Sequence, residues 1–163
     1  MGGGPLSVNA RRAHWRDIPA MLSLIEAHRR SLEQLAPGFW RRSARAPGWT
    51  RRYFRFLLVT RRATMLVAEE QSQVVGMLIG RRVAAPPVYD PGGASLLIDD
   101  FCVLSPDLWP RAGAALLDAA MRGLGRPSVA QVIVIAPAAD NAKSQWLASA
   151  GLTPVSSWWT KPL

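Results

Sequence analysis

The hydrophobic and polar positions at the start of the chain follow first a strand period and then a helical one. Residues 6–12 form the first predicted strand. From Ile18 onwards, apolar residues recur at helical spacing, which predicts a helix that runs into the low thirties. Asp17 can cap this helix, and Pro19 is tolerated in its first turn.

The next segments predict a second helix and a hairpin. Breaks with proline and glycine at residues 36–38 and 46–48 precede a helix at residues 49–61, with apolar residues on one side and arginines on the other. Two β-rich runs then flank the polar turn at residues 70–73, which predicts a hairpin. The turn-rich segment APPVYDPGG, residues 85–93, predicts a loop.

The second half of the chain continues this alternation of strands and helices. A strand is predicted at residues 95–104 and a helix at 111–124, followed by an apolar strand at 129–137 that we expect to be buried on both faces. A short helix at residues 140–151 and strand propensity at 155–160 complete the chain. The order β-α-α-β-β-β-α-β-α-β predicts a mixed α/β sheet with helices on its faces.

Length and hydrophobicity bound the organisation. The 163 residues suit one domain with a hydrophobic core, which we place at residues 6–163 after a flexible N-terminus at 1–5. No apolar run reaches the roughly 18–20 residues of a membrane span, and the first residues lack the apolar region of a signal peptide. We therefore expect a cytoplasmic protein without a membrane partner.

The charge is concentrated in the first part of the chain. The net charge is +9, and up to residue 62 there are thirteen arginines against three acidic residues. One interpretation is a solvated surface, and the other is attraction to a nucleic acid, an acidic substrate or a phosphorylated cofactor. Few aromatic residues interleave with the arginines to stack bases, so a nucleic-acid partner is the less favoured alternative.

Cysteine and histidine offer little reactive chemistry. Cys102 is the only cysteine, which excludes an internal disulfide. It lies in an apolar run, so we interpret it as a small core residue, with a nucleophile as the alternative. His14 and His28 are isolated and are interpreted as surface or helix residues, so no metal site is predicted.

The segment LIDDFCVLSPDLWPRAGAALLDAA combines a strand with two aspartates, a turn and a helix. It resembles the acetyl-CoA motif of the GNAT family of N-acetyltransferases. ARRAHWRDIPAMLSLI resembles the family's opening strand and first helix, VAEEQSQVVGMLIGR its central hairpin, and ADNAKSQWLASAGL its last helix. The resemblance covers nearly the whole chain and implies a single-domain α/β fold with a mostly antiparallel twisted sheet and helices on both faces.

The resemblance implies transfer of an acetyl group from acetyl-CoA to a primary amine. The amine must lose a proton, and the family's usual device is a carboxylate on the central strand. Asp99 and Asp100 occupy that place, with Asp99 favoured as the base or acceptor-orienting group. Neighbours on a regular strand face opposite sides, but a bulge, which this family often has, would change that. The alternative is a buried aspartate satisfied by the backbone or by arginine.

The resemblance also implies where acetyl-CoA binds. Its pantetheine arm would pair with the strand backbone at residues 101–104, and its diphosphate would meet the N–H groups and dipole at the start of the next helix. Arg111 could add a charged contact, and Gly113 would allow close approach; of the family's loop pattern only Gly113 matches. The expected cofactor-binding residues are Phe101, Cys102, Val103, Leu104, Trp109, Arg111, Ala112, Gly113, Ala114 and Asp140.

Two features leave other functions open. The family often protonates the departing thiolate with a tyrosine in the last helix, where this chain has Leu147 beside Trp146, which we interpret as a core or interface residue. Water could suffice, because a thiol has a pKa near 8.5. The alternatives are a non-catalytic GNAT-fold module that binds acyl-CoA or a partner, and an RNA-associated acetylase.

The acceptor is expected to be a small-molecule or peptide amine. The family shapes its acceptor pocket with the first two helices, and these are rich in arginine here, so we expect an acceptor with an acidic portion. Trp158 and Trp159 would pack against a sheet edge or in a homodimer contact.

Overall fold

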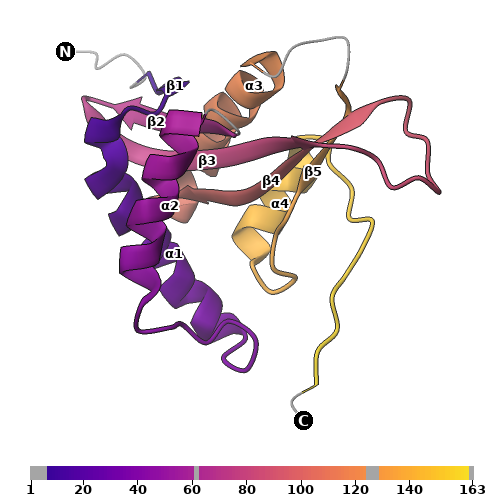
Figure 1. Cartoon of the computed structure of the whole chain (residues 1–163), viewed down its shortest axis with the longest axis horizontal. Coiled ribbons are helices and arrows are strands. Elements are labelled where there is room, and N and C mark those ends of the chain that lie inside the picture. Colours follow the sequence, from indigo (N-terminus) through magenta and orange to yellow (C-terminus); the bar gives the residue numbers. More distant parts are fainter. Residues whose placement is uncertain (1–6, 61–62, 124–128, 162–163) are drawn as a thin grey trace.

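A single mixed sheet with helices on both faces forms the body of the protein (Figure 1). This computed structural model describes residues 7–60, 63–123 and 129–161, so the predicted flexible segment at 1–5 lies outside the described residues. The strands follow the spatial order β1-β2-β3-β4-β5. Their bounds are Asn9–Arg12 for β1, Thr64–Glu70 for β2, Gln73–Val83 for β3, Ala94–Val103 for β4 and Val129–Val134 for β5.

The first four strands are antiparallel, whereas β4 and β5 run parallel. The helices are α1, Ile18–Leu35; α2, Ala46–Thr60; α3, Ala114–Gly123; and α4, Asn141–Ser149. The predicted α/β fold class, mostly antiparallel with helices on both faces, is thus confirmed.

Each face of the sheet carries its own hydrophobic cluster. Side chains alternate along a strand, so Leu66 packs toward α3 and α4 while Val67 packs toward α1 and α2. The α1/α2 face contains Met21, Ile25 and Phe54, all nearly inaccessible to solvent. The five strands therefore separate two cores, and a side chain on β4 belongs to one or the other.

The hairpin predicted around residues 70–73 is present. A two-residue turn, Gln71 and Ser72, connects β2 and β3, and both residues have positive φ (50° and 65°). Two-residue hairpin turns require this conformation because it matches the twist of the strands. The loop predicted at residues 85–93 is also confirmed, since no strand or helix occurs there.

Three element predictions are corrected. The second helix begins at Ala46, because Pro47 fits its first turn instead of breaking the chain. Strand β5 ends at Val134 and is half exposed, because it lies at the edge of the sheet instead of in its centre. No strand forms at residues 155–160, where Trp158 and Trp159 are exposed and do not cover a sheet edge.

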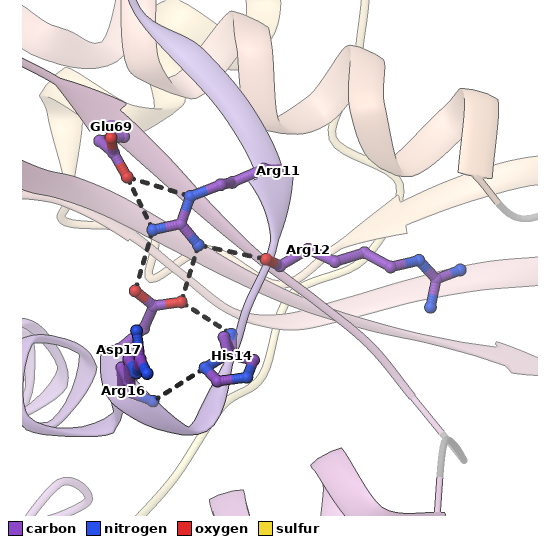
Figure 2. Close-up of polar contacts among 6 residues, drawn as sticks. All are labelled: Arg11, Arg12, His14, Arg16, Asp17 and Glu69. Atoms are coloured by element: carbon purple, nitrogen blue, oxygen red, sulfur yellow. Dashed lines mark hydrogen bonds and ion pairs between the residues drawn. The ribbon is translucent and has the colours of Figure 1, made fainter. Parts of the chain in front are cut away.

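Arg11 connects three elements at the start of the chain (Figure 2). Its guanidinium donates two hydrogen bonds to Asp17 (2.8 and 3.0 Å) and two to Glu69 on β2 (3.0 and 2.6 Å). Asp17 also accepts from the His14 N–H at 2.7 Å. The arginine on β1 thus fixes the beginning of α1 against the sheet, and its hydrogen bonds hold the pKa of Asp17 below its usual range.

Arg11→Ala is expected to lower the free energy of unfolding by about 1–3 kcal/mol, because it removes charged hydrogen bonds from the buried Asp17. The lowered pKa of Asp17 means that its contribution is present above its ordinary pKa and is lost as pH falls. Urea unfolding at neutral and acidic pH should therefore show the difference from wild type shrinking in acid. Arg12→Ala removes the exposed side chain of the following residue and should change the free energy of unfolding little. An equal loss in this variant would contradict the role given to the Arg11 hydrogen bonds.

Candidate active site

Strand β4 contains a bulge at the two aspartates. Ile79 pairs with Asp100 and Gly80 pairs with Ile98, which leaves Asp99 as an extra residue without a partner on β3. Ile98 belongs to the α3/α4 cluster and Cys102 to the α1/α2 cluster. Because Asp99 follows Ile98 and Asp100 shares the parity of Cys102, both carboxylates lie on the face covered by α1 and α2.

The two carboxylates differ in their surroundings. Burial raises the pKa of Asp100, and the neighbouring Asp99 raises it further, whereas Arg29 on α1 opposes this. Asp99 is about one third exposed (34%), lies 3.5 Å from the Arg81 guanidinium and accepts the Asp100 N–H at 3.0 Å. Tyr53 on α2 has its pKa raised by burial and then by Asp99. Asp100 is thus the carboxylate that is more shielded from solvent, and Asp99 is the one that pairs with Arg81.

One edge of β4 pairs with β3, and the other pairs with β5 over only part of its length, so the sheet opens there. The last backbone hydrogen bond between the parallel strands runs from Ile135 N–H to Ile98 C=O (2.9 Å), and the strands separate beyond it. Leu104 N–H donates to Val75 C=O on β3 (2.8 Å). Backbone groups alternate along an antiparallel strand, so those of Phe101 and Val103 point away from β3 toward the opening. Those of Cys102 and Leu104 point toward β3.

A cleft of about 670 Å³ borders this opening. Its walls come from α1, the end of β4 and the segment that leads into α4. Four of the residues expected from the sequence to bind the cofactor line it: Val103, Leu104, Trp109 and Asp140. Asp140 also caps α4, accepting the Lys143 N–H at 3.1 Å. The backbone of Val103 borders this volume, whereas the Phe101 C=O accepts a hydrogen bond from Lys143 Nζ (2.9 Å).

The helix after β4 starts earlier than the sequence predicted. It opens with a 3-10 turn at Pro106–Leu108 and a π-helical turn at Trp109–Gly113, which lead into α3. The prediction of a start at residue 111 was wrong because Pro106, not Pro110, occupies the first turn. Pro106 and Pro110 lack N–H groups, and Asp107 places a negative charge in the first turn. This tip fits a diphosphate poorly.

The residues of that turn have other partners in the structure. Arg111 forms an ion pair with Glu70 at the end of β2. Ala112 and Gly113 are buried, and a side chain on Gly113 would lie 2.6 Å from the Trp109 ring. The glycine thus makes room for the tryptophan ring, and its expected contact with the cofactor stays a prediction. Ala114 begins α3 and is partly buried.

The architecture resembles that of solved structures, although the sequence matches no known family. At the sequence level, no protein-family model and no curated protein matches the chain. A predicted acetyltransferase from Clostridium acetobutylicum, solved with acetyl-CoA, is similar in structure with a TM-score of 0.66 and 17% identity, covering 95% of this chain and 96% of that one. The chain has the GNAT acetyltransferase fold.

Two further structures share the GNAT fold at similar distance. A ribosomal-protein-alanine N-acetyltransferase from Brucella melitensis has a TM-score of 0.63 and 18% identity over 96% of this chain and 98% of its own. An aminoglycoside N-acetyltransferase in complex with CoA has a TM-score of 0.72 and 12% identity over 100% of this chain and 99% of its own. At such identities the likeness establishes the fold alone.

Three aromatic rings fill the GNAT core behind the cleft. Trp109 and Trp146 stack with ring centroids 5.0 Å apart, and Phe101 meets both edge to face at 5.0 and 5.7 Å. Trp146 is buried, which confirms its interpretation as a core residue. Cys102 is likewise in the core, where burial raises the pKa of its thiol to about 12 and keeps it unreactive.

Sequence reasoning missed two residues of this region. Lys143 on α4 is 1% exposed, and burial lowers its pKa to about 8. His28 is on α1, as its interpretation as a surface or helix residue allowed, but its place in the cleft was not foreseen. There burial, and secondarily Lys143, lower its pKa to about 4. One sign in the sequence sets Lys143 apart: it is one of only two lysines in a chain whose other strongly basic residues are all arginines.

The described residues contain neither a candidate membrane span nor a candidate metal cluster. No helix in the described part of the chain has the length and apolar character needed to cross a membrane. Within residues 7–60, 63–123 and 129–161, no group of three or more histidine, cysteine, aspartate or glutamate side chains could hold a metal ion.

Proposed function

We propose that the protein is an N-acetyltransferase that moves the acetyl group of acetyl-CoA to a primary amine. One observation carries the proposal: the β4 backbone at Val103 faces away from β3 beside the cleft, and a partly buried carboxylate, Asp100, lies on the α1/α2 face of the same strand. The free edge suits an extended amide-containing arm, and the carboxylate suits a proton acceptor. Similarity in fold to structures with acetyl-CoA or CoA supports the same activity.

In this proposal each residue has a defined task. The backbone groups of Val103 and the Phe101 N–H bind the pantetheine arm as an added strand would, while the Phe101 C=O accepts from Lys143 (2.9 Å). Acetyl-CoA supplies the activated acetyl group. Asp100 accepts the proton of the attacking amine, because a partly buried carboxylate with a raised pKa is a stronger base than an exposed one. Asp99, favoured by the sequence, orients the acceptor together with Arg81.

The acceptor is proposed to carry an acidic portion. A second hollow, of about 510 Å³, lies between α1 and α2 and includes Arg30 and Arg51 in its lining. It reaches Ser23, which also lines the cleft beside β4. Two guanidinium groups at this position would attract a carboxylate or phosphate on the acceptor.

The function is tested by binding first and turnover second. Titration of acetyl-CoA by calorimetry is expected to give saturable one-site binding, and thiol release is expected with at least one member of a panel of amines. For that amine, raising the salt from about 0.05 M to 0.5 M should raise KM if the arginines attract it. Binding without turnover across a broad panel would support a non-catalytic acyl-CoA-binding module instead. No binding at all would overturn the proposal.

A further inference from the structure

A buried amine lies at the point where the two parallel strands part. Lys143 extends from α4, and its Nζ donates hydrogen bonds to Phe101 C=O (2.9 Å) and Ile135 C=O (3.2 Å). These two carbonyls belong to β4 and to the residue just after β5, so the ammonium bridges the strands immediately beyond their last mutual hydrogen bond, between Ile135 and Ile98. Lys143 thus occupies the root of the opening.

The environment of this amine is unusual for lysine. Among the described residues it is the only basic side chain in the buried set, and its charge is met by carbonyl oxygens and ring faces instead of a carboxylate at ion-pair distance. Its Nζ lies 5.4 Å from the Phe101 ring centroid and 5.6 Å from that of Trp109. A lysine is rarely buried without a carboxylate partner, and perturbed lysines of this kind are typical of functional sites.

Lys143 is also adjacent to both parts of the proposed reaction. Phe101 C=O, which it binds, is on the β4 edge where the pantetheine arm would pair. Trp109, whose ring centroid is 5.6 Å from the amine, and Ala142, the residue before Lys143, both line the cleft, and Lys143 itself is buried behind them. The amine is therefore at hydrogen-bonding range of the strand edge on which the thioester would lie.

Acetyl transfer creates a need for a proton at this place. As the acceptor nitrogen bonds to the acetyl carbon, the carbon–sulfur bond breaks and its electron pair stays on sulfur. The thiolate must then take a proton or be stabilised by a positive charge. Of the two tyrosines, Tyr53 is on α2 near Asp99, and Tyr89 is 72% exposed in the loop before β4. Neither is at the root of the opening.

We propose that Lys143 is the general acid that protonates the coenzyme A thiolate as it leaves. This inference rests on the proposed acetyl transfer. The acceptor amine gives one proton to Asp100, and Lys143 gives one to sulfur, so the products are the acetylated amine, free CoA, a neutral Lys143 and a protonated Asp100. Exchange of a proton between these two residues through solvent restores the starting state.

The acidity of the group agrees with this role. Burial lowers the pKa of Lys143 to about 8, near the pKa of about 8.5 of an ordinary thiol, so the proton transfer is nearly balanced. The groups that face the amine are Cys102 and Asp100 on β4, Asp140 at the start of α4 and His28 on α1. His28 has its pKa lowered to about 4 and Cys102 raised to about 12, so neither changes charge between pH 6 and pH 9.

The test compares wild type with Lys143→Met, which keeps most of the side-chain volume and removes the charge. The first readout is the ultraviolet absorbance of the thiolate of bound CoA during a pH titration. The thiol is expected to titrate about 1–3 pH units lower in wild type than in Lys143→Met, since a nearby ammonium favours the thiolate. The second readout is turnover, and kcat should fall about 10²-fold or more in Lys143→Met. In wild type kcat should decline above about pH 8 as Lys143 loses its proton, and this limb of the pH profile should be absent in the variant. The affinity for acetyl-CoA should change little.

The chain offers a clean control because Lys143 and Lys161 are its only lysines. Lys161→Arg should match wild type in both readouts. In protein labelled on its lysine side chains, Lys161→Arg leaves a single lysine signal, whose titration near pH 8 tests the acid directly.

The outcomes separate the two proposals. If CoA binds and turnover proceeds but the bound thiol titrates identically in Lys143→Met, the lysine is structural and only this inference fails. A mass gain of one acetyl group on Lys143 would make it an acceptor and would also overturn it. If CoA does not bind to wild type, acetyl transfer itself is wrong, and the inference falls with it.

Discussion

Replacing Asp100 with asparagine is expected to lower kcat by about 10²–10⁴-fold, the usual effect of removing a general base. Asparagine has nearly the same shape but cannot accept the proton of the acceptor amine. Acetyl-CoA affinity should stay nearly unchanged, because the proposed cofactor contacts come from the backbone edge on the other side of β4. Steady-state kinetics and calorimetry on the same preparation measure the two effects.

Although Asp100→Asn should lower kcat, it should leave the stability of the fold unchanged or raise it. Burial and Asp99 raise the pKa of Asp100, so the folded state holds its proton more tightly than the unfolded chain does. Its ionised form therefore destabilises the fold, and this penalty grows as pH rises through the raised pKa. At neutral pH the variant should unfold at the same temperature as wild type or higher, and the difference should shrink in acid.

Asp99→Asn is the matched control, since it makes the same substitution one residue away. Asp99 is partly exposed and paired with Arg81, so its loss should affect turnover less than the loss of Asp100. If Asp99→Asn is the slower variant, the base is Asp99, as the sequence favoured. Unchanged kcat in both would remove the two carboxylates from the mechanism.

The order of elements up to β5 and α4 followed from local signals. Asp17 and Pro19 mark the start of α1, and a polar turn marks the β2–β3 hairpin, because capping and turn chemistry depend on a few adjacent residues. The place of the aspartates on β4 was also predictable. Their common face was not, because the bulge at Asp99 is defined by pairing with β3, which no local pattern encodes.

The failures share a dependence on distant contacts. The sequence at 129–137 is as apolar as a central strand, yet β5 lies at the sheet edge because no strand forms at 155–160. Lys143 has no local sign of burial; the two carbonyls that satisfy its ammonium belong to Phe101 and Ile135, which chain folding brings together. Gly113 fitted the phosphate-loop pattern, but its neighbour in space is a tryptophan ring.

Trp109→Ala is expected to lower the free energy of unfolding by about 3–5 kcal/mol, as is typical when a buried tryptophan is truncated. The ring stacks on Trp146, meets Phe101 edge to face and closes one side of the cleft. Its loss leaves a cavity that these rigid neighbours cannot fill. Urea unfolding gives the value, and Trp159→Ala, at a side chain 93% exposed, should stay within about 0.5 kcal/mol of wild type.

A second substitution at Gly113 tests the cause of that loss. In wild type, Gly113→Ala should cost about 1–3 kcal/mol, because the new methyl would lie 2.6 Å from the Trp109 ring. In the Trp109→Ala background the closest obstacle is gone, and only the Trp146 ring remains, 3.3 Å from the new methyl. The cavity left by Trp109 gives that ring room to shift, so the same change should cost much less and become neutral or stabilising. Alanine is favoured over glycine in a helix by about 0.5–1 kcal/mol, which adds to this reversal of sign.

Gly48→Ala provides the reference, because Gly48 is helical and has open space where the methyl would go. It should be neutral or stabilising in both backgrounds. If Gly113→Ala costs the same with and without Trp109, the two residues are energetically independent, and the glycine is required for a reason other than the ring. A sign that reverses only at Gly113 means that the glycine and the tryptophan form one packing unit, which sets the position of the helix beside the cleft.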